Sequence, residues 1–246
     1  MDDISWLGWA VLGASSFLIG FSKTGLPGVG ILSILLIASV IPARASTGLV
    51  LPMLIVGDIF AVSYYHRHAV WRYLLILLPF AVIGVIIGYV GMGFVDDRQL
   101  GRIIGAIVLV LLAVNAWWSR RKAGEDAVPS SWLVGAVFGL LAGVTTMMAN
   151  AAGPIMIIYL LAMRLPRHEF VGTGAWYFLL VNCFKVPFSA HLGLITFASL
   201  KFNMMLVPLI ICGALSGVAL MKHIPEKGFK VVVELLAVAA AIKLVW

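Results

Sequence analysis

The sequence predicts an all-α integral membrane protein, a polytopic bundle of about ten helical segments. Of its 246 residues, 63% are hydrophobic and only 11% are charged, and the mean hydropathy is +1.11. A soluble domain carries about 25% charged residues because its surface must face water. This chain has too few charges to cover such a surface. Apolar runs that approach the ~20 residues of one membrane span recur along the whole chain.

No segment between these runs is long enough to fold as a soluble domain, so we expect one transmembrane domain over residues 1–246. The start, Met1-Asp2-Asp3, lacks the basic leader of a signal peptide, and the first run is therefore expected to stay as a helix. The apolar runs fall at 4–20, 29–41, 46–65, 70–92, 99–118, 131–148, 152–163, 170–190, 202–221 and 228–246.

Two of the runs, 29–41 and 152–163, are too short to span a bilayer. Each follows a stretch rich in Gly, Pro or Ala, at 22–28 and at 149–154. Short apolar segments after such breaks are typical of broken or re-entrant helices. Non-helical backbone at membrane depth is tolerated only where protein or a water-filled cavity satisfies it, so we expect the two breaks to meet near the protein centre.

The two breaks occupy matching places in an internal repeat. The pattern P-x4-G-x3-G-x3-M occurs twice, 129 positions apart, and upstream the offset is 124, as between Asp58 and Asn182. We therefore assign one repeat to 1–118 and a second to 131–246, joined by a basic loop at 119–130. The residues of the pattern are Pro79, Gly84, Gly88 and Met92, then Pro208, Gly213, Gly217 and Met221.

Because each repeat holds five segments, an odd number, the second must enter the membrane with the opposite orientation. The loop charges agree, since the basic clusters fall on one side if both termini lie outside, and the loop 119–130 is then cytoplasmic. An inverted repeat is the signature of alternating-access transporters. The clusters are Arg67 and Arg72; Arg120, Arg121 and Lys122; Arg164 and Arg167; and Lys222, Lys227 and Lys230.

The remaining composition excludes several other classes. The net charge of +7 resides in short loops rather than in a patch for nucleic acid, so no nucleic-acid partner is expected. Cys183 and Cys212 lack the spacing of metal ligands and are interpreted as buried hydrophobic residues. Neither a Walker A sequence nor an H-E-x-x-H motif is present. We expect no enzyme activity, no metal and no cofactor.

Lys23 is the first candidate for a binding role, because a charge at membrane depth costs about 2.5–3.5 kcal/mol and usually has a partner or a purpose. It could bind an anion beside the free N–H groups at the start of the 29–41 helix. Alternatively, it could be a lysine that reaches the interface. Asn150, Gly153 and Pro154 form the matching break, which either binds a ligand or only permits close helix packing.

Asp58 is the clearest carboxylate within a span, and Lys185 lies in the eighth apolar run. Asn182 and Lys185 are three residues apart and share a helix face. Asp58 could form a structural ion pair, or it could couple transport to an ion. The candidate substrate-binding residues are Lys23, Thr24, Gly25, Gly28, Thr47, Asn150, Ala152, Gly153, Asn182 and Lys185.

The chain resembles the TauE/SafE family of sulfite exporters, also called anion permeases. The resemblance covers nearly the whole chain and rests on two features: the break from Gly20 to Gly30 with its short helix ending at Pro42, and the stretch from Ala142 through Gly153-Pro154 to Pro166. A glycine-rich run is usual in each family break, and it is degraded here. The resemblance implies a bacterial inner-membrane transporter of sulfite or other sulfur-containing or organic anions.

These observations favour a secondary transporter that exports a small anion, with sulfite or a small organosulfonate as the first candidates. Its partners would be that anion and membrane lipids, and a homodimer is left open. A non-transporting scaffold or assembly subunit is the alternative from another class. Within the transporter class, an importer coupled to protons or sodium remains, with Asp58 as the coupling site.

Overall fold

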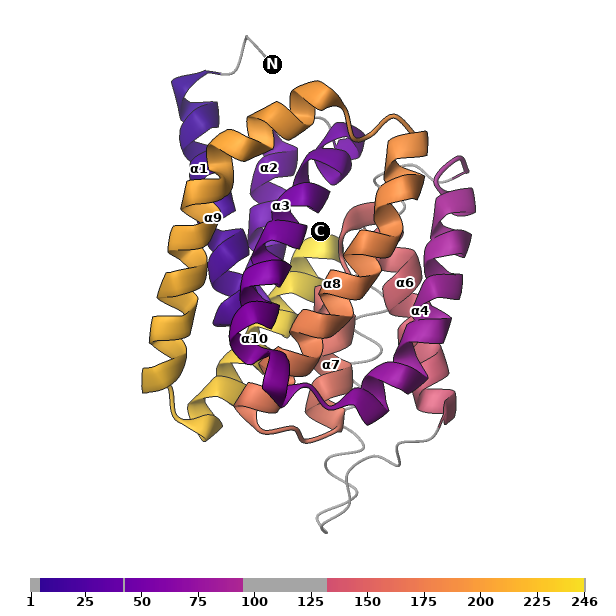
Figure 1. Cartoon of the computed structure of the whole chain (residues 1–246), viewed down its shortest axis with the longest axis vertical. Coiled ribbons are helices and arrows are strands. Elements are labelled where there is room, and N and C mark those ends of the chain that lie inside the picture. The colour runs from indigo at the N-terminus through magenta and orange to yellow at the C-terminus, as the bar shows by residue number, and fades with distance from the viewer. Residues whose placement is uncertain (1–4, 42, 95–131, 246) are drawn as a thin grey trace.

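The computed structural model describes residues 5–41, 43–94 and 132–245, and these form a bundle of helices with no strand among them (Figure 1). A short 3-10 turn, His66–His68, joins the helix Ala43–Tyr65 (α3) to the helix Trp71–Gly91 (α4). The described helices are α1 (Trp6–Thr24), α2 (Val29–Val40), α3 (Ala43–Tyr65), α4 (Trp71–Gly91), α6 (Trp132–Ala149), α7 (Gly153–Ala162), α8 (Arg167–His191), α9 (Phe197–His223) and α10 (Glu226–Val245).

The expected all-α membrane protein is confirmed. Four of the described helical segments are long and apolar enough to cross a bilayer: Ala45–His68, Trp71–Gly91, Trp132–Ala149 and Phe197–His223. Large apolar side chains point outward from α4 and α9, which a soluble surface of this extent would not tolerate. They include Leu75, Ile83, Ile86, Ile87 and Val90 on α4, and Met204, Met205, Leu209 and Leu215 on α9.

The helices of the two halves run in opposite directions. In Figure 1, α1, α3 and α9 descend from the end that carries the N-terminus, whereas α4, α6 and α8 ascend. Each helix of the first half is thus antiparallel to its counterpart in the second: α1 to α6, α3 to α8, and α4 to α9. The short helices also differ in direction, with α2 ascending and α7 descending.

Matching glycines make matching helix contacts in the two halves. A Cβ added to Gly84 of α4 would collide with the carbonyl oxygen of Leu140 in α6. A Cβ added to Gly213 of α9 would collide with the carbonyl oxygen of Phe17 in α1. Glycine at these positions permits close helix packing in a membrane. The contacts α4–α6 and α9–α1 are therefore equivalent, and this geometry supports the inverted repeat that the sequence predicts.

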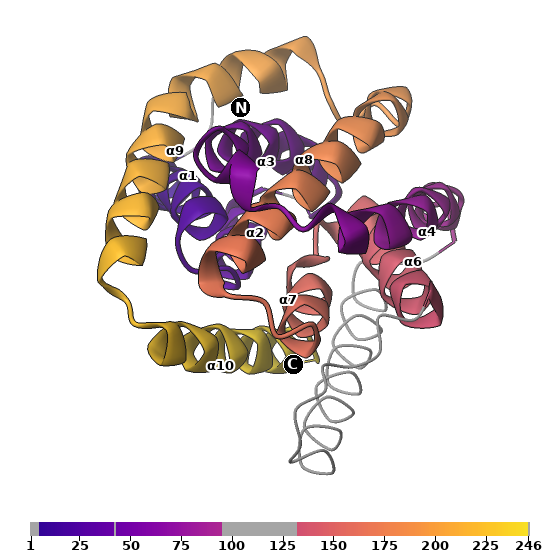
Figure 2. The ribbon, with the colours of Figure 1, turned by 60° about the horizontal axis from the view of Figure 1, so that its bottom comes forward.

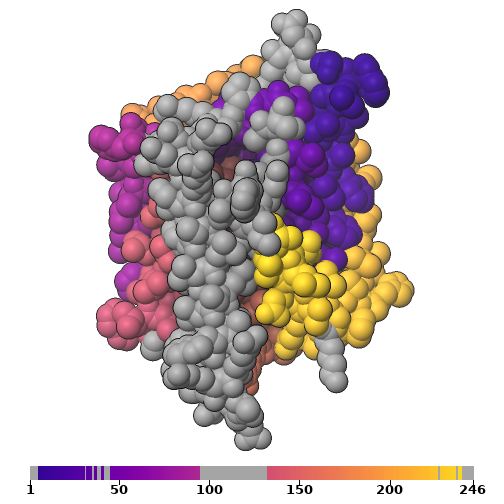
Figure 3. Space-filling view, turned by 180° about the vertical axis from the view of Figure 1, so that it is seen from behind, coloured from indigo at the N-terminus to yellow at the C-terminus, as the bar shows by residue number. Residues whose placement is uncertain are grey.

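The remaining helices lie at the outside of the bundle. In Figure 2, α10 crosses one side of the bundle near α7, and the two helices are in contact. On the reverse face, shown in Figure 3, α1 and α10 reach the surface on one side and α4 and α6 on the other.

Cys183 and Cys212 are exposed, so their interpretation as buried residues is wrong. Each lies on a helix side that faces outward, where a membrane offers lipid in place of protein.

The three basic turns within the described residues lie at one end of the bundle, opposite the start of α1 (Figure 1). They are the turn after α3, the turn between α7 and α8, and the turn between α9 and α10. The predicted basic loop 119–130, as well as Pro42, lies outside the described residues. The orientation with both termini outside stays a prediction.

Cysteine labelling tests this orientation. In a background with Cys183 and Cys212 replaced by Ala, a cysteine at Arg67 should be labelled from the cytoplasm by an impermeant maleimide. A cysteine at the exposed Phe197 should be labelled from outside the cell. The pair Arg121 and Asp97 should give the same contrast. Labelling of both members of a pair from one side would contradict the inverted topology.

Candidate functional site

The first break is shorter than the sequence indicated. We expected non-helical backbone from residue 22, but α1 continues through Thr24, so the interruption comprises 25–28. Ser22, Lys23 and Thr24 are compatible with a helix, and only the Gly-Leu-Pro-Gly stretch ends it. Gly28 has a φ of 107°, a conformation that favours glycine. The Ser22 hydroxyl then accepts a hydrogen bond from the Gly30 N–H at 2.9 Å, which ties the start of α2 to α1.

The second break comprises 150–152, between α6 and α7. Asn150 ends α6 with a φ of 53°, in the left-handed region that asparagine tolerates better than most residues. Its side-chain amide donates to the backbone carbonyl of Thr47 at 3.0 Å, which links the break to α3. Pro154 occupies the first turn of α7, where its missing N–H removes no helical hydrogen bond.

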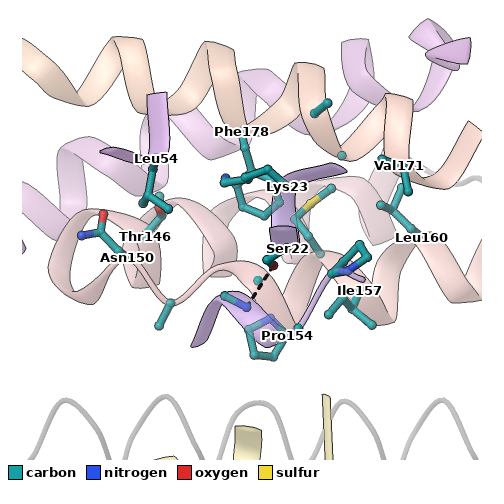
Figure 4. Close-up of a pocket in the computed structure, with 18 of the residues that line it drawn as sticks. Ser22, Lys23, Leu54, Thr146, Asn150, Pro154, Ile157, Leu160, Val171 and Phe178 are labelled. Carbon is teal, nitrogen blue, oxygen red and sulfur yellow. Dashed lines mark hydrogen bonds between the residues drawn. The ribbon is translucent and has the colours of Figure 1, made fainter. Parts of the chain in front are cut away.

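Both breaks line one cavity of about 80 Å³ (Figure 4). The first break contributes Pro27 and Gly28, and the second contributes Asn150 and Ala151. The expected meeting of the two breaks is therefore observed. On the same measure a single water needs about 10–15 Å³, so the cavity can hold an ion of several heavy atoms.

Lys23 lies at the cavity wall and forms an ion pair with Asp58 of α3. The Lys23 Nζ is 2.7 Å from Asp58 Oδ1, and it lies 4.1 Å from the centroid of the Phe178 ring. The Lys23 side chain is 12% exposed and that of Asp58 is fully buried. Of the two interpretations of Lys23, the lysine that reaches the interface is wrong, because its ammonium is held inside the bundle. An ion pair at Asp58, one of its two expected roles, is observed.

Asp58 also meets its counterpart in the repeat. The side-chain amide of Asn182 donates to Asp58 Oδ2 at 2.7 Å, and these two residues are separated by 124 positions. Positions that correspond by the repeat therefore meet at the centre, where α3 and α8 are in contact. The carboxylate is thus paired with a cation at Oδ1 and accepts a hydrogen bond from an amide at Oδ2.

Lys185 continues the polar network from the second half of the chain. Its Nζ donates to Asn150 Oδ1 at 2.6 Å and to Thr146 Oγ1 at 3.1 Å, and it lies 3.5 Å from Asn182 Oδ1. The Lys185 side chain is 1% exposed. The network thus runs from Lys23 through Asp58 and Asn182 to Lys185, and it joins both repeats.

Half of the ten predicted binding residues lie on the cavity wall, namely Lys23, Gly28, Asn150, Gly153 and Asn182. The other five do not line it. Thr24 donates to the Ala214 carbonyl at 2.6 Å, and Gly25 packs on Gly217, so both serve the contact between α1 and α9. Ala152 is buried outside the lining, Lys185 reaches the wall through its partners, and Thr47 presents its carbonyl to Asn150.

Ser22, Thr146 and Phe178 also line the cavity and were not among the predicted binding residues. Thr146 lies 124 positions after Ser22, so the repeat offset was a signal that could have identified this pair of hydroxyls. Phe178 carried no such signal, because aromatic residues are common throughout the chain. In the described part of the chain, no cluster of three His, Cys, Asp or Glu side chains could hold a metal ion.

The fold is that of a polytopic membrane protein, in which two interrupted helices meet at a cavity with a lysine and several polar side chains in its wall. The chain belongs to the family described as sulfite exporter TauE/SafE, which matches residues 12–244. The resemblance noted from the sequence is thus confirmed over nearly the whole chain. No curated protein and no solved structure was found to match it.

Proposed function

We propose that this protein is a secondary transporter that exports a small anion, sulfite or a small organosulfonate, across the bacterial inner membrane. The protein supplies no chemical reaction in this proposal. Its task is to bind the anion at the cavity and to expose that cavity first to one side of the membrane and then to the other.

The observation that carries the proposal is a lysine with several neutral polar side chains in the otherwise largely apolar wall of the cavity where the two helix breaks meet. Lys23 has three N–H donors, of which Asp58 takes one, so donors remain for a ligand. Ser22, Thr146 and Asn150 add neutral polar groups from both repeats. A packing defect requires no such groups, because buried polar groups are costly without partners.

The ion pair fits release as well as binding. A lone lysine in a medium of low dielectric would hold an anion too tightly, whereas the Asp58 carboxylate at 2.7 Å offsets much of the attraction. Transport requires a site that is favourable enough to enter and weak enough to leave. Transport also requires alternating access, which the inverted helices can provide if one repeat rocks against the other.

A binding and flux screen tests the proposal. Purified protein is expected to gain thermal stability with sulfite or a small sulfonate, by about 2.7 kcal/mol at 100 times the Kd. Proteoliposomes should then release the same anion faster than protein-free liposomes do. The panel should include thiosulfate, sulfate, sulfoacetate and simple carboxylates.

The scaffold alternative predicts a different result from the same screen. If the network only holds helices together, no anion stabilises the protein and none crosses the membrane faster than through lipid. An importer would instead move the anion inward only when a proton or sodium gradient is imposed.

A further inference from the structure

Lys185 is a buried lysine that forms no ion pair with a carboxylate of the described residues. The ion pairs found there are Lys23–Asp58 and the exposed pair Lys230–Glu226. The partners of Lys185 are the Thr146 hydroxyl and the side-chain oxygens of two asparagines, which are neutral. Such oxygen atoms can solvate an ammonium ion and bring no negative charge of their own.

The partial charges of the helix ends at the cavity change the net charge of the site little. A helix carries about half a positive charge at its start and half a negative charge at its end. The start of α2 lies beside the end of α1, and the start of α7 lies beside the end of α6. Each break therefore brings one end of each sign to the cavity. With Lys23 and Asp58 cancelling, the formal charge of the described site is one positive, from Lys185.

We propose that Lys185 makes the cavity selective for singly charged anions over doubly charged ones. This inference rests on the proposed function and specifies the charge of its substrate. A monoanion in the cavity brings the formal charge of the described site to zero. A dianion leaves one uncompensated negative charge in a medium of low dielectric, which carries a large desolvation penalty.

Thr146 is the group that carries the influence of Lys185 to the ligand. Its oxygen accepts from Lys185 Nζ at 3.1 Å, and the residue lines the cavity near Asn150 (Figure 4). Its hydroxyl hydrogen has no acceptor among the described residues. The neighbouring Thr145 hydroxyl, in contrast, donates to the Leu141 carbonyl at 2.8 Å. A hydroxyl polarised by an ammonium ion is a strengthened donor, and the Thr146 hydrogen is free to bind an anion oxygen.

This assignment names the ionic form of the substrate. Alkanesulfonates carry one negative charge, as does hydrogensulfite, whereas sulfate and fully deprotonated sulfite carry two. Exported sulfite would therefore leave as hydrogensulfite.

Methanesulfonate and sulfate provide the test, because both present tetrahedral sulfur and oxygen atoms and they differ by one charge. In proteoliposomes that contain the whole chain, exchange of labelled methanesulfonate should exceed that of sulfate by at least tenfold. Thr146→Val should lower methanesulfonate exchange by about tenfold, the loss of one hydrogen bond to a charged group. Lys185→Met should lower it further.

Thr145→Val is the matched control, because it removes a hydroxyl one residue away that bonds only within α6. It should leave the exchange rates unchanged. Should Lys185→Met fail to fold, two results still test the inference. They are the anion selectivity of the wild-type protein and the comparison of Thr146→Val with Thr145→Val. Equal or faster exchange of sulfate, or equal effects of the two valine variants, would overturn the inference. Absence of exchange for every anion would instead refute the proposed function.

Discussion

Replacing Lys23 by Met is expected to lower the free energy of unfolding by about 3–5 kcal/mol, because it leaves a buried carboxylate without its cation. Asp58 is fully buried, and its remaining partner would be the Asn182 amide at 2.7 Å. Methionine keeps most of the volume of the lysine side chain, so the effect reports the lost charge rather than a cavity. The measurement is thermal and denaturant unfolding of the purified protein in detergent.

Two further variants isolate the ion pair. Lys23→Met combined with Asp58→Leu removes both charges, and it should recover much of the lost stability, since a buried pair often contributes little against apolar replacements. Lys230→Met is the surface control, since its ion pair with Glu226 is long, at 3.7 Å, and exposed. Such a pair contributes about 0–1 kcal/mol. A cost for Lys23→Met no larger than that for Lys230→Met would contradict the buried ion pair.

The stable double variant also separates the two roles of Lys23. If Lys23 binds the anion, a folded protein without it should lose anion binding and flux. If it serves only to neutralise Asp58, the double variant should transport normally. Stability and transport thus become independent measurements on the same residue.

The sequence was sufficient to place the interruptions of the helices, because glycine and proline act locally. Gly28 adopts a φ that other residues rarely adopt, and Pro154 fits the first turn of a helix. These requirements depend on the neighbouring residues alone. The exact end of α1 was missed by three residues because Lys23 and Thr24 carry no local signal against a helix.

The contacts at the cavity depended on the tertiary fold and were less accessible. The repeat identified Asp58 and Asn182 as equivalent, yet equivalence alone does not show that two side chains meet. They meet because an inverted repeat places equivalent central helices across a pseudo-twofold axis. The place of Lys185 behind the wall, and of Thr24 against α9, depends on how each helix is rotated in the bundle. In an apolar chain the hydrophobic pattern does not determine that rotation.

Export of the anion is expected to need only the membrane potential. A potential that is negative inside favours outward movement of a negative charge by about 2.3 kcal/mol per 100 mV. A monoanion should therefore reach an outside-to-inside ratio of about 50 at that potential, without sodium or a pH gradient. This expectation leaves Asp58 in a structural role, as the ion-pair partner of Lys23 at 2.7 Å.

Proteoliposomes with a clamped potassium potential provide the measurement. Loaded methanesulfonate or sulfite should leave when the interior is negative, and the rate should fall when the potential is collapsed. The charge of the transported ion follows from the same experiment, since a tenfold ratio corresponds to about 59 mV for one charge and to half of that for two. An anion that stays in place under the potential, and moves once a proton gradient is imposed, would contradict uniport. Asp58 would then become the first candidate for the proton site.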